Sequence, residues 1–141
     1  MPEQQSYLDA LRREVVKQGL SSEISFVGPM QNDAIAARLE EADLFASASR
    51  TGSLDKTLVE AMAMELPVIA SNDAFAEILS RHKDMLLYAE GDFRELAAKI
   101  EELIELSPQE REKIGKELRE IILRGHTVSS LVAKIVSAYS L

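Results

Sequence analysis

The sequence predicts an α/β fold in which helices cover a short parallel sheet of about four strands. Three observations support this prediction. Short apolar runs alternate with longer segments whose apolar residues recur at helical spacing. Glycine, proline and small polar residues separate these segments. The run Val68-Ile69-Ala70 contains no polar residue, which is typical of a strand buried on both faces.

The first third of the chain is expected to form a helix, a strand, a second helix and a second strand. Residues 4–18 carry one apolar stripe and predict the first helix. Residues 24–27 (ISFV) are predicted to be a strand, with a turn at Gly28-Pro29. Asn32 or Asp33 is expected to cap the second helix, which leads into a strand over residues 44–46.

The central segment reads as a helix that runs directly into a buried strand. Ser53 is the predicted N-cap, and Pro67 ends the helix because it has no amide N–H and clashes with the preceding turn. The free N–H groups at the start of such a helix carry partial positive charge and suit a phosphate. Lys56 and Glu60 lie on one face of the helix. An ordinary core helix with an exposed ion pair is the alternative interpretation.

The second half continues the alternation and ends in helices. Asn72 or Asp73 is expected to cap a helix, and residues 85–88 (MLLY) are predicted to be a further strand. Asp92, Ser107 and Thr127 are the expected caps of the last three helices, with a proline directly after Ser107.

Composition excludes several classes of function. The chain has no cysteine, so disulfides, thiolate metal sites and a cysteine nucleophile are excluded. A net charge of −8 argues against a nucleic-acid-binding protein, which needs a basic surface. No apolar run approaches the ~20 residues that cross a bilayer, and no signal peptide is apparent. We therefore expect a cytoplasmic protein with no nucleic-acid partner and no transmembrane segment.

The central run allows a comparison with a known family. Residues 55–71 read DKTLVEAMAMELPVIAS. This run resembles the donor-site segment of the group 1 glycosyltransferases, a large retaining family with the GT-B fold that uses nucleotide sugars. Its members typically show a glutamate, seven residues, Glu-Ala-Met-Ala and then Pro-Val-Ile. Residues 20–28 (LSSEISFVG) and 39–49 (LEEADLFASAS) fit the same family. The resemblance covers nearly the whole chain.

The resemblance implies a set of site residues. Glu60 matches the family's second glutamate and is expected to accept both ribose hydroxyls of the nucleotide. The strand-end loop at Phe26, Val27 and Gly28 is expected to hold the base. The donor diphosphate is expected to contact the loop and helix start at Arg50, Gly52, Ser53, Leu54, Asp55 and Lys56. No catalytic residue is expected in this chain, because the acceptor's general base would lie in another domain. No metal or cofactor is expected either, since no Asp-x-Asp cluster is apparent and the GT-B fold usually works without one.

The chain also departs from the family pattern. Gly52 stands where the family has its first glutamate, and Glu65 replaces the glycine that usually ends the central helix. The Gly-Gly pair expected near the phosphates is missing after residue 71. A subgroup of the family has a Gly-Ser-Leu-Asp-Lys-like version of this motif. A relic or interaction domain that has the fold and no longer binds nucleotide is therefore the alternative to a donor-binding domain.

The resemblance implies a Rossmann-like three-layer sandwich that lacks the first βα unit of the GT-B C-terminal domain. Residues 1–141 are then one partial donor domain, which we expect to be inactive without an acceptor domain. The full-length enzyme would transfer a hexosyl group with retention, in the cytoplasm or against the inner face of the membrane. The missing unit leaves a strand edge open, and such an edge invites pairing. The expected partners are a nucleotide sugar and either the acceptor domain or a second copy of the chain.

Overall fold

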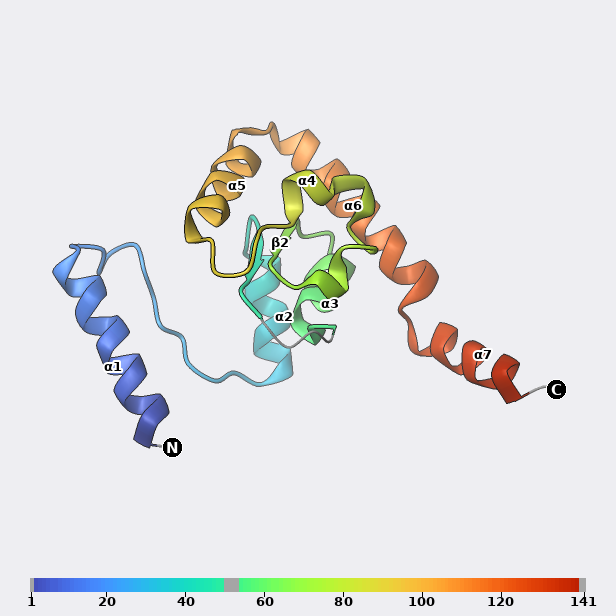
Figure 1. Cartoon of the computed structure of the whole chain (residues 1–141), viewed down its shortest axis with the longest axis horizontal. Coiled ribbons are helices and arrows are strands. Elements are labelled where there is room, and N and C mark those ends of the chain that lie inside the picture. The colour runs from blue at the N-terminus through green and yellow to red at the C-terminus, as the bar shows by residue number, and fades with distance from the viewer. Residues whose placement is uncertain (1, 50–53, 140–141) are drawn as a thin grey trace. The chain divides into compact units, whose positions relative to one another are not determined.

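The computed structural model describes residues 2–49 and 54–139 of the chain (Figure 1). The chain divides into two compact units, Met1–Ile35 and Ala36–Leu141. Mixed α/β structure is confirmed, with a short parallel sheet in the second unit. None of the helices in the described part of the chain is long and apolar enough to cross a membrane.

The first unit contains a helix followed by extended chain. Helix α1 (Pro2–Lys17) confirms the predicted first helix, and Gly19 follows it with a φ of 71°, a conformation that glycine adopts readily. The predicted strand at residues 24–27 is wrong, because this segment belongs to no strand. Ile24 and Val27 are 41% and 54% exposed. A strand needs a ladder partner, and the described part of this unit offers none.

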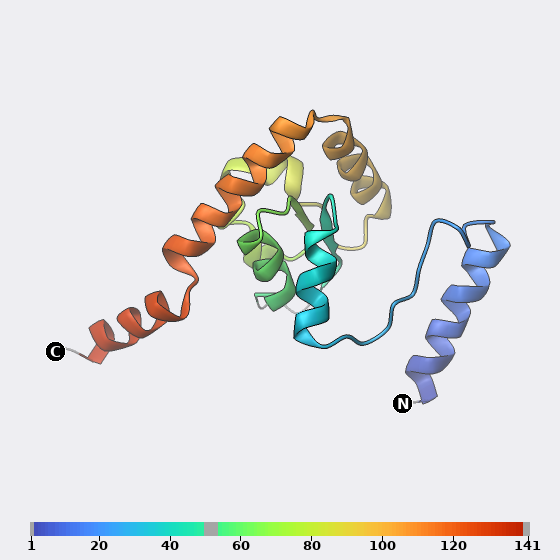
Figure 2. The same ribbon diagram turned by 180° about the vertical axis from the view of Figure 1, so that it is seen from behind.

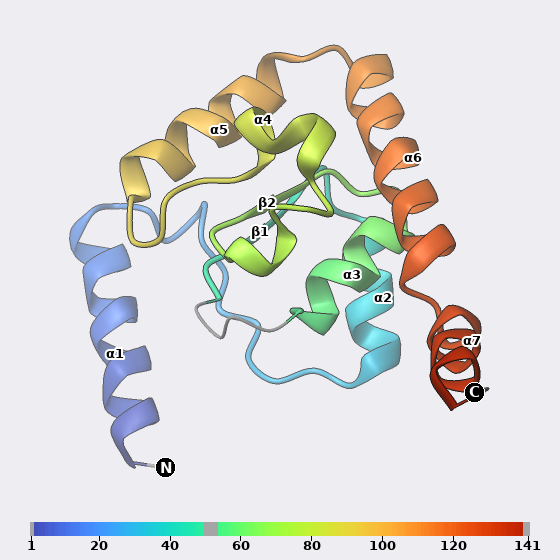
Figure 3. The same ribbon diagram turned by 45° about the vertical axis from the view of Figure 1, so that its right-hand side comes forward.

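Helix α2 (Asn32–Glu40) leads toward the sheet. The predicted cap at Asn32 or Asp33 is wrong, because both residues lie inside the helix and the Ile35 amide bonds to the carbonyl of Gln31, the residue before it. The sheet consists of β1 (Phe45–Ser47) and β2 (Val68–Ala70), which are parallel, with Phe45 opposite Val68 and Ser47 opposite Ala70. Helix α3 (Lys56–Ala63) connects the two strands. In Figure 3 the strands lie between α3 on one side and α4 (Lys83–Leu86) with α5 (Phe93–Glu105) on the other.

The sheet has two strands among the described residues, fewer than the predicted four or so. The predicted strand at residues 85–88 is wrong, since α4 (Lys83–Leu86) takes up its first half. The Leu87 amide still bonds to the Lys83 carbonyl, as in a helix. A single parallel bridge between Ala70 and Leu87 remains, together with the bond from the Tyr88 amide to the Ala70 carbonyl.

Short and long helices follow the sheet. Asn72 caps the 3-10 helix η1 (Asp73–Phe75) by accepting the Ala74 amide, so the cap is confirmed and the helix is shorter than expected. The further helices are η2 (Ser80–His82), α5 (Phe93–Glu105), α6 (Pro108–Gly125) and α7 (Val128–Tyr139). The predicted caps Asp92, Ser107 and Thr127 are confirmed by their hydrogen bonds to first-turn amides.

The core of the second unit lies around α3, β2 and α6. Apolar side chains from these elements and their neighbours are completely buried: Leu58, Met62, Val68, Ile69, Phe75, Leu79, Leu86, Leu103 and Leu118. Burying each such side chain contributes about 1.5–3 kcal/mol. The buried face of α3 therefore fixes the helix against the sheet and leaves its start at the sheet's carboxyl edge.

Helix α6 packs against the C-terminal end of α3 (Figures 2 and 3). Glu65 has a φ of 64°, the left-handed conformation that the family's glycine would adopt more easily. A Cβ added at Gly115 of α6 would lie 1.8 Å from the Glu65 carbonyl oxygen. Gly115 therefore permits this close approach, and Arg119 adds an ion pair to Glu65 at 3.5 Å.

Candidate functional site

Three chain segments meet at Ser47, the last residue of β1. Its carbonyl oxygen accepts the Ser71 amide at 3.3 Å, which continues the pairing with β2. The same carbonyl accepts the hydroxyl of Tyr88, at 3.4 Å, from the segment after α4. The carboxyl ends of strands in an open α/β sheet are where such folds bind ligands. Ser47 therefore marks the edge of the sheet where a site is expected.

The Ser47 side chain extends this arrangement to the helix that follows. Its hydroxyl accepts the Ser49 amide at 3.3 Å and donates to Asp55 Oδ2 at 2.8 Å. Asp55 Oδ1 accepts the Thr57 amide at 3.0 Å. Ser47 is 9% exposed, so water competes little for these bonds. The hydrogen bond between the Ser47 and Asp55 side chains thus links the end of β1 to the start of α3.

Helix α3 begins at Lys56 with Asp55 as its N-cap. The start predicted at Ser53 is wrong, because Asp55 is a stronger acceptor in the same role and is held by Ser47. Ser53, Arg50 and Gly52, all predicted to contact the diphosphate, lie outside the described residues. Within the described residues, the amides of Lys56 and Leu58 have no hydrogen-bond acceptor.

The predicted ribose ligand lies near the start of this helix. Glu60 Oε1 is 3.2 Å from Lys56 Nζ, and the two side chains are 39% and 75% exposed. The carboxylate is therefore accessible to a ligand. Leu54 is exposed beside this pair in the sequence. The structure brings Asp55, Lys56 and Glu60 together on one short helix, as the spacing predicted.

A hollow of about 370 Å³ opens at the same edge of the sheet. It is lined by polar residues that follow the strand ends, and by an alanine: Ser49, Ser71, Asn72, Asp73, Tyr88, Ala89 and Glu90. Lys56 and Glu60 do not line this hollow. The sequence motifs did not predict this hollow. Ser71 and Asn72 directly follow β2, and ligands of open α/β sheets bind at the carboxyl ends of strands, so their position in the sequence was a usable signal.

The three residues predicted to hold the base belong to the first unit. Arg12 lies over the Phe26 ring, with its guanidinium carbon 5.9 Å from the ring centre, within reach of a cation–π interaction. Val27 is exposed, and Gly28 has a φ of 69°. The residues predicted to hold the ribose and the diphosphate belong to the second unit.

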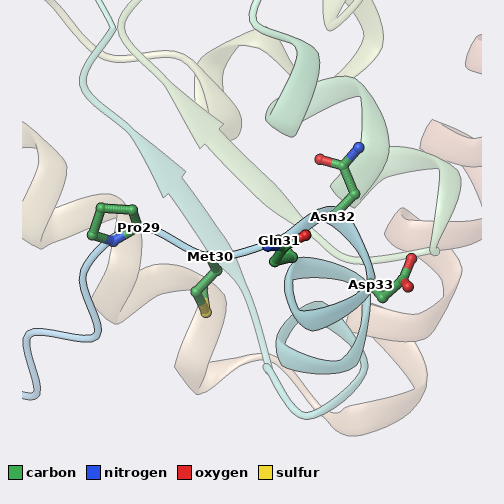
Figure 4. A pocket seen from close by; sticks show the side chains of 5 residues that line it. All are labelled: Pro29, Met30, Gln31, Asn32 and Asp33. Carbon is green, nitrogen blue, oxygen red and sulfur yellow. The ribbon is translucent and has the colours of Figure 1, made fainter.

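A larger, open hollow of about 550 Å³ lies along Pro29, Met30, Gln31, Asn32 and Asp33 in the first unit. These five residues are consecutive in the sequence, and Figure 4 shows the side chains of Met30 and Asn32 pointing to opposite sides of the chain. A ligand site usually draws polar groups from several elements toward one point. This hollow is therefore a bend of the chain, and it adds no residue to the site.

Two further properties bear on cofactors and charge. Across residues 2–49 and 54–139, no three His, Cys, Asp or Glu side chains cluster as a metal site would require. The expectation of no metal cofactor stays a prediction.

The pKa of Glu110 is lowered by hydrogen bonds from the Ser107 hydroxyl and amide, and the pKa of Glu112 is lowered by Lys116. Both lie on α6, away from the start of α3.

A comparison with protein families gives one match. The profile of the family described as Glycosyl transferases group 1 matches residues 2–106 of the 141-residue chain. No curated protein and no solved structure gave a significant match. The family match covers α1 to α5 and includes the whole candidate site. The chain therefore belongs to the group 1 glycosyltransferases.

Proposed function

We propose that this member of the group 1 glycosyltransferases is a donor-binding domain, which holds the diphosphate and ribose of a nucleotide sugar at the start of α3. The full enzyme would transfer a hexosyl group with retention in the cytoplasm. The general base for the acceptor would come from another domain, so this chain alone would be inactive.

The chemistry explains why such residues are needed. When the glycosidic bond of a nucleotide sugar breaks, negative charge develops on the departing diphosphate. Fixed N–H groups and a cation stabilise that charge without reorganising. The first-turn amides of α3 and Lys56 would supply them. Glu60, with two acceptor oxygens, would take the two ribose hydroxyls.

One observation supports this proposal above the others. The start of α3 lies at the carboxyl end of β1, with two first-turn amides that have no acceptor among the described residues. Glu60 follows on the same helix, partly exposed and paired with Lys56 at 3.2 Å. An anion at the helix start and two hydroxyls at the carboxylate would then belong to one ligand.

A specific observation favours the alternative, a domain of the same family that no longer binds nucleotide. The Asp55 carboxylate already occupies the Thr57 amide at the start of α3. Asp73 and Glu90 line the hollow at the sheet edge and would repel a diphosphate there. The two proposals differ in a single measurable property, the affinity for a nucleoside diphosphate.

Isothermal titration calorimetry with UDP, GDP and ADP tests the proposal. We expect one of the three to bind, and Glu60→Ala to weaken that binding by about tenfold or more, since hydrogen bonds to a charged group are lost. Glu120→Ala is the matched control, because it breaks an i,i+4 ion pair with Arg124 on α6, away from the site. It should bind as the wild type does.

No heat with any of the three nucleotides would support the non-binding alternative. Binding that survives in Glu60→Ala would contradict the ribose assignment. Lys56→Ala gives an independent check, because it removes a positive charge and should weaken binding more at low salt than at high salt.

The partners follow from the same proposal. The domain would bind a nucleotide sugar and would meet either an acceptor domain or a second copy along the open edge of its two-stranded sheet. Light scattering after size exclusion should then show a dimer or larger species at high protein concentration. A monomer at every concentration would remove the second copy from the proposal.

A further inference from the structure

Ser47 bonds to several segments of the chain at the site. Its carbonyl accepts the Ser71 amide and the Tyr88 hydroxyl, and its own hydroxyl bonds to the Ser49 amide and the Asp55 carboxylate. A serine hydroxyl has one proton to donate and lone pairs to accept, and both capacities are used here.

We infer that Ser47 is a positioning residue for the donor site, which fixes the first turn of α3 through Asp55. The inference rests on the proposed function, because it concerns the affinity of that same site for a diphosphate. The family motif described above assigns no role to Ser47.

The bond from the Ser47 hydroxyl to Asp55 is short and nearly buried. An O–H donor and a carboxylate at 2.8 Å form a charge-assisted hydrogen bond, which is about twice as strong as a neutral one. At 9% exposure, little water is available to replace the Ser47 hydroxyl. Without that hydroxyl the Asp55 side chain would be free to take other rotamers.

The Asp55 carboxylate also caps α3. Asp55 receives the Thr57 amide at 3.0 Å, so the position of its carboxylate sets the direction of the first turn of α3. The neighbouring amides of Lys56 and Leu58 belong to that turn. Donors stabilise developing charge well only when they are held in place beforehand. Loosening Asp55 would therefore weaken diphosphate binding without touching the diphosphate.

Ser47 also bonds to Ser49 through the same hydroxyl. The Ser47 hydroxyl accepts the Ser49 amide at 3.3 Å and so joins Ser49 to Asp55. One hydroxyl therefore bonds to both Ser49 and Asp55.

The test compares Ser47→Ala with Ser47→Thr, which keeps the hydroxyl in a strand where β-branched residues are favourable. Calorimetry would measure binding of the nucleoside diphosphate that the wild type prefers among UDP, GDP and ADP, and of the matching nucleoside. We expect Ser47→Ala to lose about tenfold in affinity for the diphosphate and nothing for the nucleoside. Ser47→Thr should restore wild-type affinity, and Ser80→Ala, at an exposed serine, should not change it.

Amide exchange by NMR gives a second readout that does not depend on a ligand. In Ser47→Ala the Ser49 and Thr57 amides should exchange faster, while the Tyr88 amide, which bonds to Ala70, should be unchanged. Equal diphosphate affinity in Ser47→Ala, or unchanged exchange at Ser49 and Thr57, would overturn the inference. A wild-type domain that binds no nucleotide would overturn the proposed function, and faster exchange in the same variant would still support the hydroxyl link.

Discussion

Two apolar segments with similar composition have different structures in this protein. Residues 68–70 form strand β2 and are completely buried. Residues 24–27 form no strand, although they contain the same kinds of apolar residue. β2 has β1 as its partner, bridges to Leu87 and is covered by α3. The described part of the first unit offers residues 24–27 no such partner. Amino-acid composition identifies segments that could form a strand, and such a segment forms one only where a neighbouring strand can pair with it.

The comparison predicts where substitutions are costly. In the second unit, side chains and backbone are packed at van der Waals distance, so added volume and removed volume both destabilise. In the first unit the exposed residues have little packing to lose. Substitutions at Gly115 and Ile69 should therefore cost more stability than a substitution at Ile24.

Gly115→Ala should have the largest effect on stability. The new Cβ would lie 1.8 Å from the Glu65 carbonyl oxygen, so α6 would have to move away from α3. We expect a loss of about 4 kcal/mol in unfolding free energy, measured by urea denaturation. Gly125→Ala is the control, because a Cβ there meets nothing within 4 Å. A small effect at Gly115 would mean that α6 is not seated as described.

Ile69→Ala and Ile24→Ala test the comparison itself. Ile69 is completely buried in β2, and Ile24 is 41% exposed. We expect Ile69→Ala to cost about 3 kcal/mol, through lost burial and a cavity, and Ile24→Ala less than about 0.5 kcal/mol. The same denaturation experiment measures both. Similar losses in the two variants would show that residues 24–27 are buried in solution, and would contradict the account of the first unit.

Glu65→Gly should stabilise the protein relative to Glu65→Ala. Both variants remove the ion pair to Arg119, and only glycine adopts a φ of 64° without a Cβ penalty. The expected difference in unfolding free energy is about 1 kcal/mol in favour of glycine. Equal stability of the two variants would contradict the left-handed conformation at Glu65.

The smallest effect concerns pH at the start of α6. The pKa of Glu110 is lowered below 4.5 by hydrogen bonds from Ser107. A lowered folded pKa adds stability that is present above 4.5 and is lost as the pH falls through the folded value. The difference in unfolding free energy between the wild type and Ser107→Ala should be largest at neutral pH and should decrease as the pH falls below 4.5. A difference that is constant across this range would refute the linkage.

Much of the fold could be predicted from the sequence because its signals are local. The caps at Asn72, Asp92, Ser107 and Thr127 follow from side chains that bond to their own first turn. The predicted strand at residues 85–88 failed because a helical bond from the Leu87 amide to the Lys83 carbonyl competes with the sheet. The choice between the two depends on a partner distant in sequence, which periodicity does not reveal.

The candidate site was predictable to a similar degree. The motif correctly placed Lys56 and Glu60 on one helix beside a strand end. The link from Ser47 to Asp55 was missed, because it joins residues of two elements and depends on how α3 packs. Ser53 was predicted as the cap because a serine hydroxyl can accept a first-turn amide, but the Asp55 carboxylate, which Ser47 holds, is the N-cap. The roles of Glu60 and of the predicted diphosphate residues stay predictions.

An NMR titration of the isotope-labelled domain with UDP, GDP and ADP tests the central claim most directly. The account predicts that one of these nucleotides shifts the amide resonances of Lys56, Thr57, Leu58 and Glu60, while those of Glu112 and Lys116 on α6 stay in place. Shifts confined to other parts of the chain, or no shift with any of the three, would contradict a diphosphate site at the start of α3.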